Sequence, residues 1–214
     1  MPKCIYVLAG TNGAGKSSLG GAMLRAVDVD YFNPDEAARS ILAANPTATQ
    51  AEANAAAWRE GKRLLERAIA EDLDFAFEST LGGHTIPRLL GEALDRRMEV
   101  RIWYAGLASP ELHIARVRAR VKKGGHDIPD ADIRRRFDAS REHLIDLVPR
   151  LTELRVYDNS AEADPDLGTR PVPVLVLHLQ RGQIVFPSNP SALSKTPEWA
   201  KPIVAVALRR VDGR

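Results

Sequence analysis

The eight residues from Gly10 to Ser17 constrain the fold of this chain more than any other segment. They match the pattern G-x-x-x-x-G-K-[ST] at each fixed position and read Gly10-Thr11-Asn12-Gly13-Ala14-Gly15-Lys16-Ser17. Glycines let the backbone wrap closely around a pyrophosphate and point successive N–H groups inward. In this pattern the lysine reaches the β- and γ-phosphates, and the final hydroxyl binds Mg²⁺. The segment therefore predicts a loop that binds ATP with Mg²⁺.

The flanks of this loop support that interpretation. Ile5 to Ala9 is a continuous apolar run typical of a buried strand, and 16–26 is predicted to be helical. The positive N-terminal end of that helix would lie on the phosphates, so we add Ser18 to the expected nucleotide contacts. The alternative is a chance glycine-rich turn, which has no need of a strand before it and a helix after it.

The rest of the chain alternates between strand-like and helix-like segments. We expect further strands over 27–32, 75–77, 99–105 and 154–157, and helices over 35–44, 48–69, 86–96, 109–123 and 130–147. This alternation predicts an α/β fold with a parallel sheet covered by helices on both faces. The segments 172–179 and 184–186 read as an antiparallel hairpin that extends the same sheet, with a separate domain as the less favoured alternative. A short helix is expected from Pro197, and 209–214 is expected to fray.

Composition limits the class of protein. A length of 214 residues fits one domain, 1–214, with a lid over about 109–147 and a hairpin extension over about 171–214. The formal net charge of +2 argues against a general nucleic-acid or membrane-surface binder. Cys4 is the one cysteine, so an internal disulfide is impossible. No apolar run is long enough for a signal segment or a membrane span, and we expect a cytoplasmic protein.

Several classes of P-loop protein need motifs that this sequence lacks. There is no N-K-x-D segment for reading guanine and no L-S-G-G-Q-like signature. The best match to an apolar strand ending in a metal-binding carboxylate is Phe75-Ala76-Phe77-Glu78. Kinases of small molecules tolerate such a weak segment, because phosphates, water and the loop hydroxyl hold much of the Mg²⁺ shell.

Asp35 is the leading candidate for a catalytic base. It follows the second expected strand in Phe32-Asn33-Pro34-Asp35-Glu36, and ligands of open α/β sheets bind at the carboxyl ends of strands. A carboxylate there can accept a proton from a substrate hydroxyl and orient it for attack. The alternative is that Asp35 only caps the following helix.

A second polar segment follows the third expected strand, in Phe77-Glu78-Ser79-Thr80-Leu81-Gly82-Gly83. Glu78 would contact Mg²⁺ or a substrate hydroxyl, and Thr80 would contact substrate. The alternative is that Ser79 or Thr80 caps a helix.

The basic segment 116–136 is broken at Gly124-Gly125 and is predicted to form a lid. Arg116 and Arg120 are four residues apart and share a helix face. Two helices hinged at the glycines would bring guanidinium groups onto the transferring phosphoryl group. A nucleic-acid patch is the other interpretation, and the scarcity of aromatic residues argues against it.

Together these motifs resemble the zeta-toxin-like family of P-loop kinases, and in particular its stand-alone bacterial members described as predicted ATPases. The resemblance rests on 10–17, 32–36, 77–81, 116–129, Arg136 with Ser140, and 157–160. It implies strand order 2-3-1-4-5 and an ATP-dependent kinase. Zeta toxins phosphorylate the sugar of UDP-N-acetylglucosamine, whereas this sequence departs from them around the acceptor site.

The resemblance also implies roles for individual residues. Asp35 would be the base, Lys16 the phosphate lysine, and two lid arginines would hold the γ-phosphate. We choose Arg120 and Arg136, with Arg116 among the nucleotide contacts, although the register among 116, 118 and 120 and among 134, 135 and 136 stays open. A protein antitoxin is a conceivable partner that no segment of the sequence indicates.

The expected function is transfer of the γ-phosphoryl group of ATP to a hydroxyl of a small molecule, with a nucleotide sugar as one candidate. The alternative is a regulatory P-loop ATPase or nucleotide-binding module that acts on a protein partner. A kinase needs an acceptor pocket beside the loop, lined by Asp35 and Glu78, whereas a regulatory module needs an exposed apolar patch.

Overall fold

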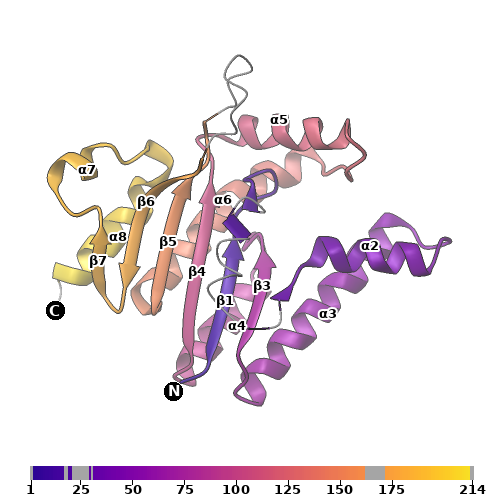
Figure 1. Cartoon of the computed structure of the whole chain (residues 1–214), viewed down its shortest axis with the longest axis horizontal. Coiled ribbons are helices and arrows are strands. Elements are labelled where there is room, and N and C mark those ends of the chain that lie inside the picture. The colour runs from indigo at the N-terminus through magenta and orange to yellow at the C-terminus, as the bar shows by residue number, and fades with distance from the viewer. Residues whose placement is uncertain (1, 17–18, 21–28, 30, 162–171, 213–214) are drawn as a thin grey trace.

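The strands of this chain form one mixed sheet. The computed structural model describes residues 2–16, 19–20, 29, 31–161 and 172–212. Within these residues the sheet has seven strands in the order β2-β3-β1-β4-β5-β6-β7 (Figure 1). The first five are parallel: β1 (Cys4–Ala9), β2 (Tyr31–Phe32), β3 (Phe75–Ser79), β4 (Glu99–Gly106) and β5 (Glu153–Asp158). The predicted α/β fold with strand order 2-3-1-4-5 is confirmed.

The helices of the described chain begin and end close to where the sequence predicts. They are α2 (Pro34–Ala44), α3 (Gln50–Ala70), α4 (Thr85–Asp95), α5 (Pro110–Val121) and α6 (Asp130–Leu147), which a short 3₁₀ turn, η1 (Val148–Arg150), follows. Capping residues fix several of these starts. Thr49 and Glu52 form a reciprocal capping box at α3, and Ser109 caps α5 with Pro110 in its first turn.

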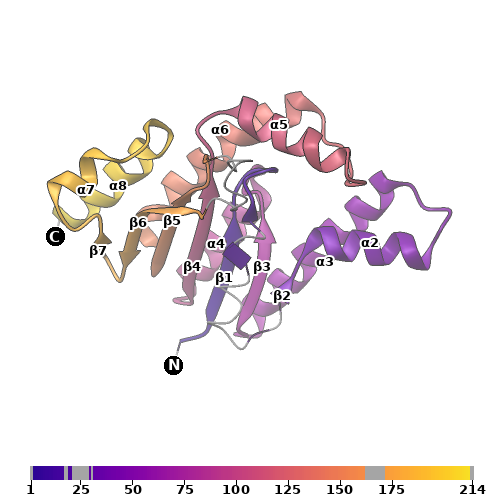
Figure 2. The same cartoon turned by 45° about the horizontal axis from the view of Figure 1, so that its top comes forward.

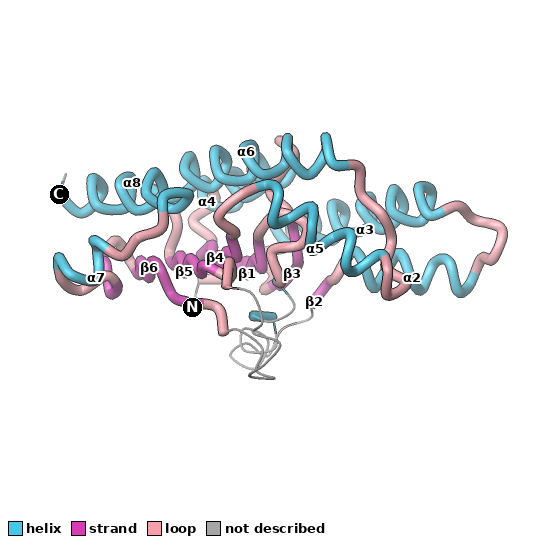
Figure 3. The backbone as a smooth tube through the Cα atoms, turned by 90° about the horizontal axis from the view of Figure 1, so that it is seen from above, coloured by secondary structure: helices cyan, strands magenta, loops and turns pink. Residues whose placement is uncertain are grey.

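The helices cover the sheet unequally. Figure 3 shows α4, α6 and α8 along one face of the strands, and Figures 1 and 2 show α5 across their carboxyl ends. Buried side chains of the strands, among them Ile5, Ile102 and Val156, form one core with Leu144 of α6. Most of the helix expected at 16–26, which would cover the second face, lies outside the described residues. Half of the strand expected at 27–32 also lies outside them, and its described end forms β2.

The C-terminal segment extends the same sheet, as predicted. Strands β6 (Val174–Gln180) and β7 (Gln183–Phe186) are antiparallel, and β6 pairs antiparallel with β5. Arg181 and Gly182 connect them with φ of +47° and +76°, which fits the two left-handed positions of a type I′ hairpin turn.

The predicted fraying of 209–214 is wrong for its described part. After α7 (Pro190–Ser194) and η2 (Glu198–Ala200), helix α8 runs from Lys201 to Asp212. Ile203, Val204 and Ala207 of α8 join the main core. Arg210 also donates to the carbonyl oxygens of Val148 and Leu151, both at 3.0 Å, so the last turn is tied to η1.

Candidate active site

The glycine-rich loop has the conformation that its sequence demands. Gly10, Gly13 and Gly15 have φ of +138°, +83° and +80°. A Cβ atom on Gly10 would lie 2.2 Å from the carbonyl oxygen of Ala105, and one on Gly13 would lie 2.7 Å from that of His113. Neither position can hold a side chain without displacing backbone, so the loop packs directly against β4 and α5.

Three side chains from distant segments hold this loop. The Asn159 amide donates to the carbonyl oxygen of Ala14 at 2.8 Å, and Arg136 donates from Nη1 to Asn12 Oδ1 at 2.8 Å. His113 Nδ1 lies 2.8 Å from the carbonyl oxygen of Asn12. Burial lowers the pKa of His113 from 6.5 to about 4, so the ring is neutral at pH 7 and its Nδ1–H donates this bond.

Lys16 lies buried between the loop and β3. Its side chain is 9% exposed, and its Nζ donates to the carbonyl oxygen of Gly10 at 2.8 Å. The same Nζ lies 3.5 Å from Oε1 of Glu78, whose other oxygen accepts from the hydroxyl of Tyr31 at 3.2 Å. Burial, and then the Glu78 carboxylate, raise the pKa of Tyr31 above its ordinary value, so this phenol stays a donor. Glu78 therefore contacts two partners, Lys16 and Tyr31, through its two oxygens.

A cavity of about 570 Å³ opens at the carboxyl ends of β1, β2 and β3. It contains six of the residues predicted for the site: Asn12, Lys16, Asp35, Glu78, Thr80 and Arg136. Its other walls come from α3 and from the segment between α5 and α6. The α3 wall carries Asn54, Ala57, Trp58 and Lys62. A lysine, carboxylates and a guanidinium group thus share one solvent-accessible hollow.

Asp35 is available for chemistry because another residue caps its helix. The side-chain oxygen of Asn33 accepts from the backbone N–H groups of Asp35 and Glu36 at 2.9 and 3.4 Å. The interpretation of Asp35 as the helix cap is therefore wrong. Its carboxylate is 42% exposed, and its Oδ2 lies 4.0 Å from Nη1 of Arg120.

Ser79 and Thr80 also do not cap a helix. Their hydroxyls accept from the N–H groups of Leu81 and Gly82 at 3.0 and 3.3 Å, which closes two tight turns in the loop before α4. The N-cap position of α4 is His84. Thr80 remains on the cavity wall, where its predicted substrate contact stays a prediction.

The lid arginines divide into two sets. Arg120 and Arg136 lie beside the site, the first near Asp35 and the second on Asn12. Arg118 and Arg134 instead form exposed ion pairs with Asp130 at 2.6 Å and Glu111 at 2.5 Å. Arg120 and Arg136, the residues chosen from the sequence, thus lie beside the site. Arg135, which pairs with Asp132 at 3.1 Å, also lines the cavity.

Arg120 also carries a buried hydrogen-bond donor that no described residue satisfies. Its Nη2 donates to the carbonyl oxygen of His126 at 3.3 Å, and its Nε is buried with no hydrogen-bond partner among the described residues. A buried donor of this kind is costly unless a ligand or water satisfies it.

A second hollow, of about 560 Å³, adjoins this arginine. Four basic side chains line it: Arg39, Arg116, Arg120 and Lys123. Arg116 also donates to the carbonyl oxygen of Ala161 at 3.0 Å. Arg39 was not among the residues expected from the sequence, although its position four residues after Asp35 places both on one face of α2.

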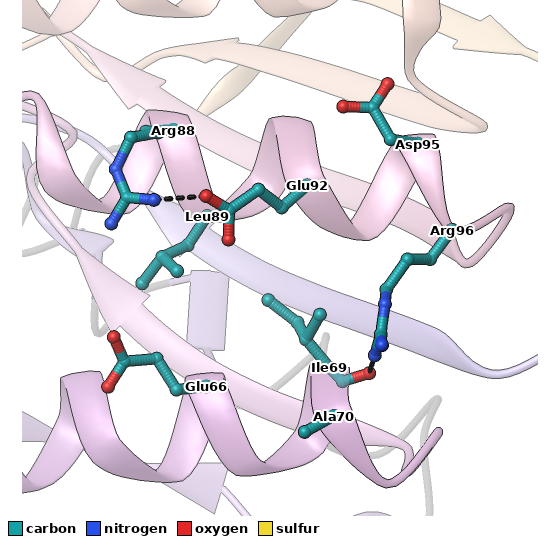
Figure 4. A pocket seen from close by; sticks show the side chains of 8 residues that line it. All are labelled: Glu66, Ile69, Ala70, Arg88, Leu89, Glu92, Asp95 and Arg96. Atoms are coloured by element: carbon teal, nitrogen blue, oxygen red, sulfur yellow. Dashed lines mark hydrogen bonds and ion pairs between the residues drawn. The ribbon is translucent and has the colours of Figure 1, made fainter.

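A third hollow of similar size lies away from these groups. It measures about 540 Å³ between α3 and α4 (Figure 4). Its charged side chains are already paired: Arg88 donates to Glu92, and Arg96 donates to the carbonyl oxygen of Ile69. We therefore place the candidate active site in the cavity at the strand ends.

Two predicted contacts, Ser17 and Ser18, lie outside the described residues. Within the described residues there is no cluster of three or more His, Cys, Asp or Glu side chains that would hold a metal ion. In the same part of the chain, no helix is both long and apolar enough to cross a membrane.

The sheet order and the glycine-rich loop with its lysine define a P-loop α/β protein. The family model described as Zeta toxin matches residues 2–164. The chain therefore belongs to the zeta toxin family.

The chain is also similar to individual known proteins. An uncharacterized protein of Haemophilus influenzae is 34% identical over 128 residues, which cover 60% of this chain and 88% of the relative. A chain of the AvrRxo1-ORF1:-ORF2 complex, solved with ATP, superposes with a TM-score of 0.64 at 15% identity. That match covers 97% of this chain, which spans 64% of the length of the AvrRxo1 chain.

A chain of the PezAT chromosomal toxin–antitoxin system of Streptococcus pneumoniae superposes with a TM-score of 0.55 at 13% identity. The match covers all of this chain and 87% of the other. At these identities the structural matches support the fold alone.

Proposed function

We propose that this protein is a kinase that transfers the γ-phosphoryl group of ATP to a hydroxyl of a small molecule. The observation that carries the proposal is the convergence of Lys16, Asp35 and Glu78 on one cavity beside the phosphate-binding loop. A kinase needs a cavity for its acceptor with an exposed carboxylate in it, whereas a regulatory ATPase that only hydrolyses ATP needs no such cavity. Membership of the zeta toxin family supports the same activity.

The proposed chemistry assigns different tasks to the two carboxylates. Asp35 does not cap its helix and its side chain is 42% exposed. It accepts the proton of the acceptor hydroxyl while the hydroxyl oxygen bonds to the γ-phosphorus. The bond from that phosphorus to the bridging oxygen breaks, and ADP leaves. Glu78 is held by Lys16 and Tyr31 and so positions Lys16 rather than moving a proton.

Positive charge is arranged around the place where negative charge would develop. Lys16 neutralises the phosphates from the loop side, and Arg120 and Arg136 approach from the lid. The hollow lined by Arg39, Arg116, Arg120 and Lys123 adds further positive potential next to Asp35. This pattern suits a polyphosphate donor.

Mg²⁺ would neutralise phosphate charge at this site when bound with ATP. The described carboxylates do not form a metal cluster of their own, which fits an ion held mainly by phosphate oxygens and water. By the loop pattern, the hydroxyl of Ser17 would supply the protein ligand.

The side chains on the cavity wall also indicate which chemical type of acceptor would fit. Trp58 is 48% exposed on the cavity wall, and Asn54 and Lys62 lie one helical turn to either side of it on α3. An aromatic surface flanked by an amide and a cation suits a polar acceptor with a ring, and a nucleotide sugar such as UDP-N-acetylglucosamine fits that description.

A phosphoryl-transfer screen tests this proposal. The purified protein would be incubated with ATP, Mg²⁺ and panels of sugar nucleotides, nucleosides and aminoglycosides, with Lys16→Met as the matched control. We expect one panel to yield a phosphorylated product and an equal amount of ADP. Slow ADP release that no acceptor stimulates would contradict a kinase and favour the regulatory ATPase.

A further inference from the structure

The C-terminal segment beyond residue 164 lies outside the match to the family model, yet one of its residues contacts the strand ends that support the phosphate-binding loop. Trp199 of η2 is 5% exposed. Its ring packs against the end of β4 so closely that a Cβ atom on Gly106 would lie 2.2 Å from the indole. Trp199 also lies beside the carboxyl end of β5, because its Nε1–H donates to Asp158 Oδ1 at 3.2 Å.

Asp158 is the hub of a turn at the end of β5. The same Oδ1 accepts from the N–H of Ser160 at 3.1 Å and from the Ser160 hydroxyl. That hydroxyl in turn accepts from the N–H of Ala108 at 2.8 Å, after the end of β4. The indole N–H, the carboxylate and the hydroxyl therefore fix the turn between two strand ends.

The residue at the centre of this turn holds the phosphate-binding loop. Asn159 is 6% exposed. Its N–H donates to the carbonyl oxygen of Gly106 at 3.0 Å, and its side-chain amide donates to that of Ala14 at 2.8 Å. Any rotation of the turn would move this amide away from Ala14. Trp199 is thus connected to the loop by its hydrogen bond to Asp158, by the peptide bond from Asp158 to Asn159, and by the hydrogen bond from Asn159 to Ala14.

We propose that Trp199 is a positioning residue for the phosphate-binding loop, so that the C-terminal extension serves nucleotide binding as well as the core. The indole N–H holds Asp158, the turn holds Asn159, and Asn159 fixes the carbonyl of Ala14. The effect on ATP rests on the proposed function, whereas the effect on the loop does not.

Trp199→Phe tests the proposal because it keeps an aromatic ring at this position and removes the N–H, together with the outer ring atoms that pack against Gly106. Ile203→Val is the matched control, since Ile203 is a fully buried residue of α8 that packs in the main core, so the change removes buried volume from the same C-terminal segment and leaves the Trp199–Asp158 bond in place. Asp158→Ala is a second variant, which removes the carboxylate that accepts from Trp199 and Ser160 and leaves the indole in place.

The first readout is hydrogen exchange of the protein without nucleotide. We expect Trp199→Phe to increase exchange in 10–16 and 158–160 relative to Ile203→Val, while the other strands exchange as before. Equal exchange in these segments for both variants would overturn the proposal, whatever the protein binds. If Trp199→Phe does not fold, Asp158→Ala breaks the same hydrogen bond and gives the same comparison.

The second readout is ATP affinity by calorimetry. We expect Trp199→Phe to weaken ATP binding about 3- to 10-fold, the value of one lost hydrogen bond, while Ile203→Val binds as the natural chain does. Equal affinities in the two variants would overturn the role in nucleotide binding and leave the kinase proposal intact. Failure of the natural chain to bind ATP at millimolar concentration would instead overturn the kinase proposal.

Discussion

The two sides of the candidate active site are built differently. On the floor, defined here as Tyr31, Lys16 and Glu78, the charged groups are mostly buried and contact one another. In residues 109–147, the segment expected to form a lid, Arg118 and Arg134 form exposed ion pairs. Arg120, Arg135 and Arg136 lie at the site. Buried charges are costly to separate, whereas exposed pairs contribute little to stability. The floor is therefore held by contacts among its own groups, whereas the exposed pairs of the expected lid would break easily when a ligand binds.

The largest expected effect is on the floor. Lys16→Met keeps a long unbranched side chain and removes the charge that would neutralise phosphate. We expect phosphoryl transfer to fall at least about 10³-fold, with the fold intact by circular dichroism. Natural turnover at saturating ATP in this variant would remove Lys16 from the mechanism.

A substitution in the expected lid should lower turnover by a comparable factor but change ATP affinity much less. Arg120→Ala should lower turnover by about 10³-fold, because a guanidinium group near the transferring phosphoryl acts mainly as charge develops. Its effect on ATP affinity should be much smaller.

Arg118→Ala is the control on the same helix. Its side chain is 65% exposed and pairs with exposed Asp130. We expect turnover within about twofold of the natural chain, since surface ion pairs are weak. Equal losses in the two variants would mean that the lid acts through its overall charge.

The contact between α5 and the phosphate-binding loop has a pH-dependent stability. His113 of α5 is buried against this loop, and burial disfavours its charged form, so its pKa is about 4 against 6.5 for an ordinary histidine. The unfolded chain therefore binds this proton more readily. The stabilising contribution is complete above pH 6.5 and is lost as the pH falls towards 4.

Denaturant unfolding measures this contribution. Between pH 7 and pH 5, His113 should lower the free energy of unfolding by about 2 kcal/mol. His113→Gln cannot titrate, so its loss over the same interval should be smaller by that amount. Identical pH profiles for the two proteins would contradict a buried neutral His113.

Limited proteolysis is expected to give the smallest effect, by a few-fold. The segment Lys122-Lys123-Gly124 ends α5 and is exposed. Cleavage there should slow when ATP and acceptor bring the lid against the floor. Cleavage at an unchanged rate with both ligands present would identify a fixed surface.

The hairpin and five of the cavity residues could be predicted because they depend on local patterns, whereas the strand order and Arg136 followed from the resemblance to zeta-toxin-like kinases. The glycines that need positive φ, the apolar strands and the carboxylates at strand ends are all visible in the sequence. Asn33 as the helix cap was missed, because Asn and Asp cap about equally well and stand two residues apart.

The supports of the loop could not be predicted in the same way. In the sequence, His113 is 101 residues from Asn12, and Asn159 is 145 residues from Ala14. Trp199 is 41 residues from its partner Asp158. No local pattern reports such pairings. The length of α8 was missed for a related reason: its stability comes from packing on the main core and from the contacts of Arg210 with η1.

Asp35 is proposed as the base of the phosphoryl transfer, and one substitution tests this role directly. Asp35→Asn retains the shape of the side chain and leaves the Asn33 cap in place, so α2 should be unaffected. ATP affinity and acceptor phosphorylation should be measured on the same preparation, with Glu36→Gln as the neighbouring control. We predict that transfer falls by about 10²-fold or more while ATP affinity stays nearly constant. Transfer close to the natural rate in Asp35→Asn would contradict the account and leave Glu78 as the next carboxylate to test.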